Sequence, residues 1–298
     1  MAAVRRGNAP CLRCTCRAFA TDHPPALPHG VPPMPTFRNI STLAGWCLAC
    51  LFFVSSAAAA DWPQWGGASV RNMVSREAGL PVTIDRGTDD APGNVRWMAK
   101  LGTNVYGNPT VCDGRVYVGT NGQALDDDRF SSRHVGVLMC LDEEDGSMLW
   151  QLAIPKRTHD LPAEHHFVLQ NCGVCSSPTV DGDRVYVVSS AAEVLCLDVN
   201  GMADGNDGPF QDEARYMAGR GEPPIELKDN DADIIWCFPL IEELGVCPHD
   251  AVSCSVLIDG DVLYTNTSNG VGGPPGAPWP EKHAYPVNPK APEFIALD

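Results

Sequence analysis

The chain has few basic residues. Its 298 residues include 21 Lys and Arg against 37 Asp and Glu, which gives a formal net charge of −16. A surface this acidic repels phosphate backbones and anionic membranes, so the composition excludes nucleic acid as the main partner. No glycine-rich phosphate loop follows an apolar strand, and no Gly-x-Ser-x-Gly nucleophile elbow occurs.

Long stretches with the 3.6-residue apolar period of a helix are also lacking, whereas alternating apolar runs are frequent. The 28 Gly and 26 Pro fit many short strands joined by turns. The apolar run from Leu43 to Val54 is too short for a comfortable membrane span. We therefore expect an all-β protein that is not an integral membrane protein.

One segment occurs three times, at residues 108–118, 177–187 and 255–265. Each copy is a β-rich run, an Asp/Gly turn and a second β-rich run with its Tyr in the same register. Asp-Gly tolerates the positive φ of tight turns, so each copy predicts a hairpin. A hairpin that recurs along a chain indicates a stacked or radial repeat architecture.

An apolar strand ending in Leu-Asp follows each hairpin, and a Trp follows the strand in the first two copies, at Trp150 and Trp236. Each unit thus holds four short strands, which describes a propeller blade. A similar run ends at Trp97 and predicts the closing strand of a further blade. The third copy ends at Asp298, before a Trp, so we expect its outer strand to be missing.

The run from Cys140 to Trp150 resembles the tryptophan-docking motif of the pyrroloquinoline-quinone (PQQ) repeat family, Ala-x-Asp-x-x-Thr-Gly-Lys-x-x-Trp. Asp142, Gly146 and Trp150 match this pattern, while Cys140 replaces the small Ala. The resemblance implies that the Trp packs against the neighbouring blade and that the Gly makes the turn. In the second copy, Asp198 and Trp236 take the corresponding docking positions.

The resulting fold prediction is a β-propeller of four-stranded antiparallel blades, with about three blades between residues 94 and 298. Propellers usually need roughly four to eight blades to close a ring. We therefore expect a fragment of a longer propeller.

The first sixty residues differ in composition from the rest. Arg38, the short apolar run and four alanines before Asp61 predict a secretory signal peptide over residues 34–60, cleaved after Ala60. An uncleaved signal anchor is the alternative. Residues 1–33 are interpreted as an upstream extension, disordered or untranslated, and residues 61–298 as the exported propeller region, periplasmic or extracellular.

Oxygen-bearing side chains alternate with glycines after the second Leu-Asp. Asp198, Asn200, Asp204 and Asn206 form a candidate calcium turn, because Ca²⁺ takes six or more oxygen ligands from a tight turn. The EF-hand register fails, since Met202 stands where the fifth-position ligand should be. The alternative is an Asx-rich turn that opens a long insertion.

Long insertions at 121–134, 200–233 and 266–292 on rigid blades suit recognition. We therefore expect an exported, non-catalytic scaffold that binds a protein partner through its inter-blade loops, similar to the propeller subunit of the outer-membrane β-barrel assembly machine. The alternative is a fragment of a PQQ-dependent quinoprotein dehydrogenase. Those enzymes often carry two adjacent cysteines, which this sequence lacks, so we predict no PQQ site and no catalytic residues.

Overall fold

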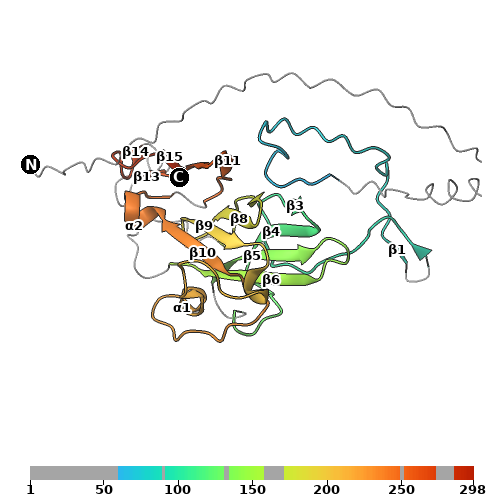
Figure 1. Ribbon diagram of the computed structural model, residues 1–298, viewed down its shortest axis with the longest axis horizontal. Helices are drawn as coiled ribbons and strands as arrows, with labels where there is room; N and C mark the ends of the chain where they lie inside the picture. The colour runs from blue at the N-terminus through green and yellow to red at the C-terminus, as the bar shows by residue number, and fades with distance from the viewer. Residues whose placement is uncertain (1–59, 89–90, 131–133, 158–170, 249–251, 273–284) are drawn as a thin grey trace, which may run out of the picture. The chain divides into compact units, whose positions relative to one another are not determined.

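The structure is a computed structural model that describes residues 60–88, 91–130, 134–157, 171–248, 252–272 and 285–298 (Figure 1). The predictions for residues 1–33, and for the signal peptide up to residue 59, lie outside the described residues.

The first repeat folds as a four-stranded antiparallel sheet whose strands follow chain order. Its strands are β3 (Thr110–Cys112), β4 (Arg115–Asn121), β5 (Val135–Asp142) and β6 (Met148–Pro155). Strand β5 is buried at every position except its last. A strand covered on both faces has no polar side to show, which explains why its sequence is a continuous apolar run.

The second repeat has the same architecture and the third has one strand fewer. The second sheet holds β7 (Thr179–Asp181), β8 (Arg184–Val188), β9 (Glu193–Asp198) and β10 (Ile234–Pro239). The third holds β11 (Leu257–Asp259), β12 (Val262–Asn266) and β15 (Phe294–Leu297). These sheets confirm three antiparallel units, the last without its outer strand.

Two-residue turns close all three hairpins, but glycine does not keep the same place in them. In the first hairpin Asp113 and Gly114 both take positive φ, 49° and 74°, the pattern of a type I′ turn. In the other two hairpins glycine is the first loop residue, Gly182 at φ 58° and Gly260 at φ 60°. The register of the Tyr is kept because every loop has two residues.

Several short elements lie outside the three sheets, and the apolar pattern of the sequence did not predict them. They are the pairs β1 (Gly87–Thr88) with β2 (Ala91–Pro92) and β13 (Val271–Gly272) with β14 (Tyr285–Pro286), the 3₁₀ turn η2 (Gly201–Ala203), and the helices α1 (Glu213–Ala218) and α2 (Leu240–Leu244). Helices of five or six residues are too short to show a periodicity. The predicted strand ending at Trp97 is wrong, because residues 93–109 contain no strand.

The first strands of the three sheets lie next to one another. The backbone N–H of Asn108 donates to Ser177 Oγ at 3.0 Å, and that of Ser177 donates to Ser255 Oγ at 2.9 Å. The three residues occupy the same position in their repeats, just before each hairpin. Because the first strands are the ones that meet from sheet to sheet, they are the axial strands of the radial arrangement.

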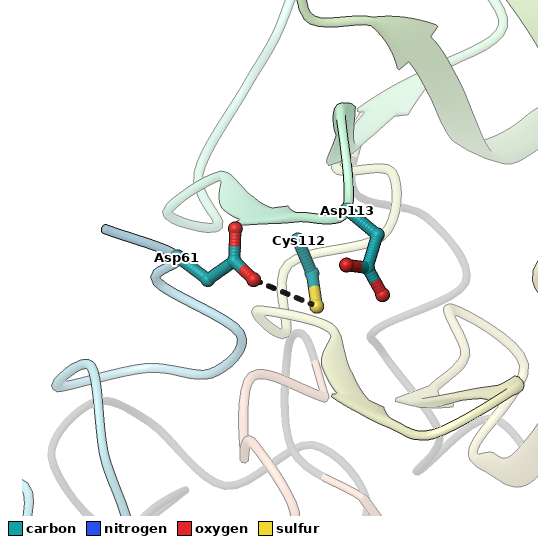
Figure 2. A group of neighbouring side chains, drawn as sticks. All are labelled: Asp61, Cys112 and Asp113. Atoms are coloured by element: carbon teal, nitrogen blue, oxygen red, sulfur yellow. Dashed lines mark hydrogen bonds between the residues drawn. The ribbon is translucent and has the colours of Figure 1, made fainter. Parts of the chain in front are cut away.

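Residues 61–71 run along these axial strands. Trp62 exchanges two backbone hydrogen bonds with Val111 in β3, at 2.7 and 3.0 Å, and the Pro63 carbonyl accepts from Val180 N in β7 at 2.7 Å. The segment begins at Asp61, whose carboxylate lies beside the Cys112 thiol (Figure 2). Further on, Arg71 Nη2 donates to the carbonyl of Val256 at 2.7 Å, next to β11.

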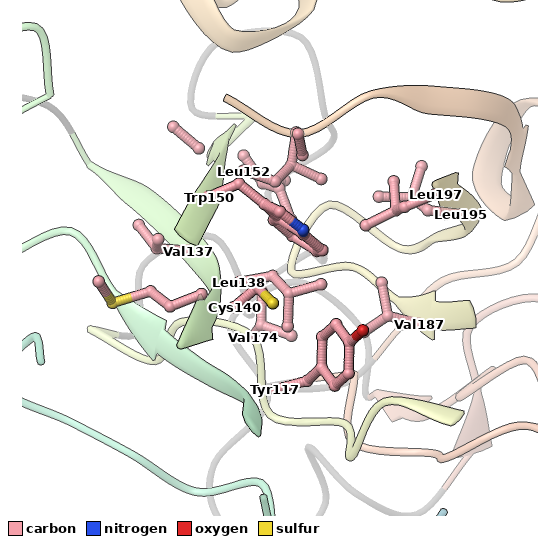
Figure 3. Close-up of a cluster of buried hydrophobic side chains, with 14 of the residues drawn as sticks. Tyr117, Val137, Leu138, Cys140, Trp150, Leu152, Val174, Val187, Leu195 and Leu197 are labelled. Carbon is pink, nitrogen blue, oxygen red and sulfur yellow. The ribbon is translucent and has the colours of Figure 1, made fainter. Parts of the chain in front are cut away.

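A continuous apolar core joins the first two sheets (Figure 3). Leu138 and Leu152 from the first sheet are fully buried with Leu195 and Leu197 from the second. The Tyr117 and Trp150 rings lie 5.9 Å apart, tilted by 54°. A second cluster, which includes Val188, Leu240 and Leu263, continues the core toward the third sheet. Face-to-face packing of sheets is thus the main source of buried apolar area.

Candidate functional site

Two indoles dock on repeat turns, and one of them joins the first unit to the second. Trp150 Nε1 donates to the Val199 carbonyl in the second sheet's turn at 2.8 Å. Trp97 Nε1 donates to the Glu143 carbonyl in the first sheet's turn at 2.9 Å. Glu143 and Val199 each follow a Leu-Asp, so both tryptophans bind the same repeat position. Trp97 therefore docks as the resemblance implied, although its backbone is not a strand.

Three motif residues, Asp142, Asp198 and Gly146, shape the turns that receive the indoles. Asp142 Oδ1 accepts the Glu144 N–H at 2.7 Å, and Asp198 Oδ1 accepts the Asn200 N–H at 2.8 Å. Both are Asx turns. Gly146 has φ 75°, and a Cβ there would lie 2.5 Å from the Trp97 ring. Asp142, Asp198 and Gly146 thus shape the turns on which the indoles dock.

Trp236 sits in the same cross-strand row as Trp150. It pairs with Cys196, which pairs with Tyr186, and the two aromatic rings lie 6.1 Å apart. In the first sheet the row is Tyr117, Cys140 and Trp150. Cys140 and Cys196 are buried free thiols whose pKa burial raises to about 12 and about 11. They fill the small apolar position that the sequence predicted.

The residues of the predicted calcium turn are divided among different partners. Asp198 Oδ2 binds Arg184 Nη1 at 2.7 Å, and Asn200 Oδ1 accepts from Arg115 Nη2 at 2.7 Å. The Asn200 amide also donates to Asp204 at 2.8 Å. Asn206 instead donates to Glu213 Oε2 at 2.8 Å. Calcium binding by this turn stays a prediction.

A second group of ligand-type residues comprises Asp61, Cys112 and Asp113, which pattern reasoning missed because Asp61 is remote in sequence (Figure 2). Cys112 Sγ donates to Asp61 Oδ2 at 3.8 Å. Partial burial and the two carboxylates raise the pKa of Cys112 to about 11. A pKa this high keeps the thiol protonated at neutral pH, where it donates to Asp61.

Two of the predicted insertions meet and form one surface. Arg129, in the first insertion, binds both carboxylate oxygens of the fully buried Asp231, in the second, at 2.7 and 2.8 Å. It also pairs with Asp127, which accepts from Gln151 at 2.8 Å. This bidentate pair fixes the two loops against each other. The third insertion is described at its two ends, residues 266–272 and 285–292.

An open cleft of about 1510 Å³ lies between this second insertion and the ends of the sheets. Its walls come from the end of β6, from α1 and from residues 219–224. Glu193 lines the cleft and accepts from Tyr216 Oη at 2.5 Å and Ser189 Oγ at 2.8 Å. Burial raises the pKa of Glu193 above its ordinary value, since desolvation outweighs these hydrogen bonds.

Four cationic side chains line the cleft, although the chain as a whole is acidic. Lys156, Arg157, Arg215 and Arg220 line it, with Arg157 paired to Glu242. Acidic residues line it as well, so the wall presents both signs.

Comparison with known families identifies the repeat. Residues 119–206 match the PQQ_2 family, described as outer membrane protein assembly factor BamB. Residues 119–206 therefore carry a PQQ-like repeat. No curated protein matches it. Among the described residues of this PQQ-like repeat protein, helices long and apolar enough to cross a membrane are absent.

Solved structures similar to the PQQ-like repeat chain come from two kinds of protein. Quinohemoprotein alcohol dehydrogenase from Comamonas testosteroni has 14% identity and a TM-score of 0.35, covering 75% of this chain and 29% of that one. The dehydrogenase ADHIIG from Pseudomonas putida HK5 has 14% identity and a TM-score of 0.40, covering 71% and 24%. BamB from Moraxella catarrhalis has 13% identity and a TM-score of 0.32, covering 61% and 40%. The chain spans less than half the length of each of these structures.

Proposed function

We propose that this PQQ-like repeat protein is an exported, non-catalytic scaffold that binds a protein partner through its inter-blade loops. The observation that carries the proposal is the course of residues 61–71 along the axial strands. In the quinoprotein alternative, PQQ stacks in the centre of the ring. Here Trp62 and Pro63 hydrogen-bond to the free edges of β3 and β7, the edges that face that centre.

The surface proposed for the partner is the one built by the first and second insertions. The Arg129–Asp231 pair holds it rigid, and the cleft beside α1 opens from it. A pre-ordered loop surface loses little conformational entropy on binding, which favours recognition. Export, from the predicted leader, places this surface in the periplasm or outside the cell.

The test of the scaffold uses the full chain expressed with its own leader. A photo-crosslinking residue replaces Glu222, which is exposed on the cleft wall, or Asp183, which is exposed on a hairpin turn as the control. We expect one defined protein adduct from position 222 and none from position 183, in the extracytoplasmic fraction. Equal labelling at both positions would contradict binding through the insertion surface.

The quinoprotein alternative is tested on the same purified chain. Titration with PQQ and Ca²⁺ should leave the quinone absorbance unchanged, and no quinone-dependent dye reduction with alcohols or sugars is expected. Saturable micromolar quinone binding with dye reduction would establish the dehydrogenase alternative instead.

A further inference from the structure

Two buried carboxylates lie beneath the second insertion. Glu213 opens α1, and Asp233 comes just before β10; both side chains are 0% exposed. Neither makes an ion pair with Lys, Arg or His among the described residues. Buried charges in proteins are normally paired or bound to a metal, because isolated burial is very costly. These two carboxylates therefore need an explanation.

Neighbouring groups bring the two carboxylates together. Asn206 Nδ2 donates to Glu213 Oε2 at 2.8 Å, and the N–H of the next residue, Asp207, donates to Asp233 Oδ2 at 2.8 Å. The N–H of Ile234, the residue after Asp233, contacts Glu213 Oε1 at 3.4 Å. Consecutive residues on both sides thus hold the two acids in one small space.

Two oxygen atoms in this space have no hydrogen-bond donor. They are Asp233 Oδ1 and Asn206 Oδ1, and both atoms are buried. Leaving a buried acceptor unsatisfied costs about 1–3 kcal/mol, and more for a charged group. All these features describe a site that lacks positive charge.

We propose that Asp233, Glu213 and Asn206 form a divalent-cation site of the calcium class. The available ligands are oxygen atoms alone, two carboxylates and one side-chain amide. Hard oxygen donors on an irregular loop suit Ca²⁺, whereas structural zinc sites are built from Cys and His and Mg²⁺ demands near-ideal octahedral geometry. This site shares only Asn206 with the calcium turn predicted from the sequence.

The ion would join three separate parts of the second unit. Asn206 lies in the loop after η2, Glu213 on α1 and Asp233 at the start of β10. A cation between them anchors the whole insertion to the sheet. It would also neutralise the negative charge of the carboxylates that lie where the insertion leaves and rejoins the blade.

Calcium titration of the metal-free full chain by calorimetry tests the site. The variant Asp233→Asn keeps an oxygen for the Asp207 N–H and removes the charge, so circular dichroism should show an unchanged fold. We expect wild type to bind one Ca²⁺ per chain and Asp233→Asn to bind it at least about tenfold more weakly. The matched control is Asp204→Asn, an exposed residue of the predicted turn, which should bind as wild type does.

Several results would overturn the proposal. The first is a wild-type chain without calcium binding, and the second is an Asp233→Asn variant with wild-type affinity. Loss of binding in Asp204→Asn alone would assign the ion to the predicted turn instead. Equal affinity for Mg²⁺ would contradict the calcium class.

Discussion

Trp150 in the first sheet donates its indole N–H to the carbonyl of Val199 in the second, across 2.8 Å. The indole is 1% exposed and lies against Gly201, where a Cβ would come within 2.9 Å of the ring. One side chain thus supplies both apolar burial and a specific polar contact between neighbouring units. The stability of the sheet-to-sheet junction should depend strongly on this residue.

Replacing Trp150 should separate these two contributions. Trp150→Ala is expected to lower the free energy of unfolding by about 3–5 kcal/mol, because a large buried ring is removed. Trp150→Phe keeps most of the packing but orphans the Val199 carbonyl, and should cost about 1–3 kcal/mol. Urea unfolding measures both. The control is Trp65→Ala, at a residue that is 38% exposed. It should lower the free energy of unfolding by less than about 1 kcal/mol.

Two glycines with positive φ should differ in their tolerance of a methyl group. Gly182 has nothing within 4 Å of the added Cβ, so Gly182→Ala should cost only the left-handed strain, about 1–2 kcal/mol. In Gly146→Ala the methyl would also strike the Trp97 ring at 2.5 Å. We expect Gly146→Ala to lower the free energy of unfolding by about 1–3 kcal/mol more than Gly182→Ala, because the methyl group overpacks the site. Equal losses in thermal or urea unfolding would mean that Trp97 does not dock there.

Stability should depend on pH through Glu193. Burial raises the pKa of Glu193 in the folded state above that of an ordinary carboxyl group. At a pH between these two pKa values, the folded state holds a proton that the unfolded state has released. The free energy of unfolding should therefore be highest below the ordinary value and fall as pH rises through the folded pKa. Glu193→Gln, which can still accept from Tyr216 and Ser189, should lack this fall.

Urea unfolding from pH 4 to pH 8 measures the effect as the difference between wild type and Glu193→Gln. That difference should grow in favour of the variant as pH rises. Glu222→Gln, at an exposed position on the same cleft, should follow wild type throughout. A constant difference between wild type and Glu193→Gln would show that Glu193 titrates normally.

Export should leave Asp61 as the first residue. The predicted signal peptide ends at Ala60, so N-terminal sequencing of the extracytoplasmic protein should read Asp-Trp-Pro-Gln-Trp. This start preserves the pairing of Trp62 with Val111. Uncleaved chain found solely in the cytosol would contradict export.

The repeated hairpins and the docking tryptophans could be predicted from the sequence because they depend on local chemistry. Each of these features appears as a short local sequence pattern: a two-residue turn, an alternating strand, or a strand that ends in Leu-Asp. Trp97 shows the limit of this approach: its side chain docks as expected, but its backbone has no strand. Side-chain docking needs only an acceptor such as the Glu143 carbonyl, whereas a strand needs a partner along its whole length.

The buried acids could not be predicted in the same way. Asn206, Glu213 and Asp233 are spread over 28 residues, and the loop and helix that bring them together lack apolar periodicity. The sequence pattern indicated Asp198 and Asn200 as calcium ligands. In the structure their side-chain oxygens accept hydrogen bonds from two arginines on different strands. Long-range arginine partners leave no local signal. The same holds for Arg129 and Asp231, which lie 102 residues apart.

The segment along the axial strands makes the order of synthesis matter for folding. Arg71 meets its acceptor, the Val256 carbonyl, across 185 residues of chain. Arg71 therefore cannot complete its native contact until the third hairpin has been made. Contacts this distant in sequence raise the contact order and slow folding. Until Trp62 and Pro63 have docked, the edges of β3 and β7 stay open to pairing with other chains, so the nascent protein is at its most aggregation-prone before the segment covers them.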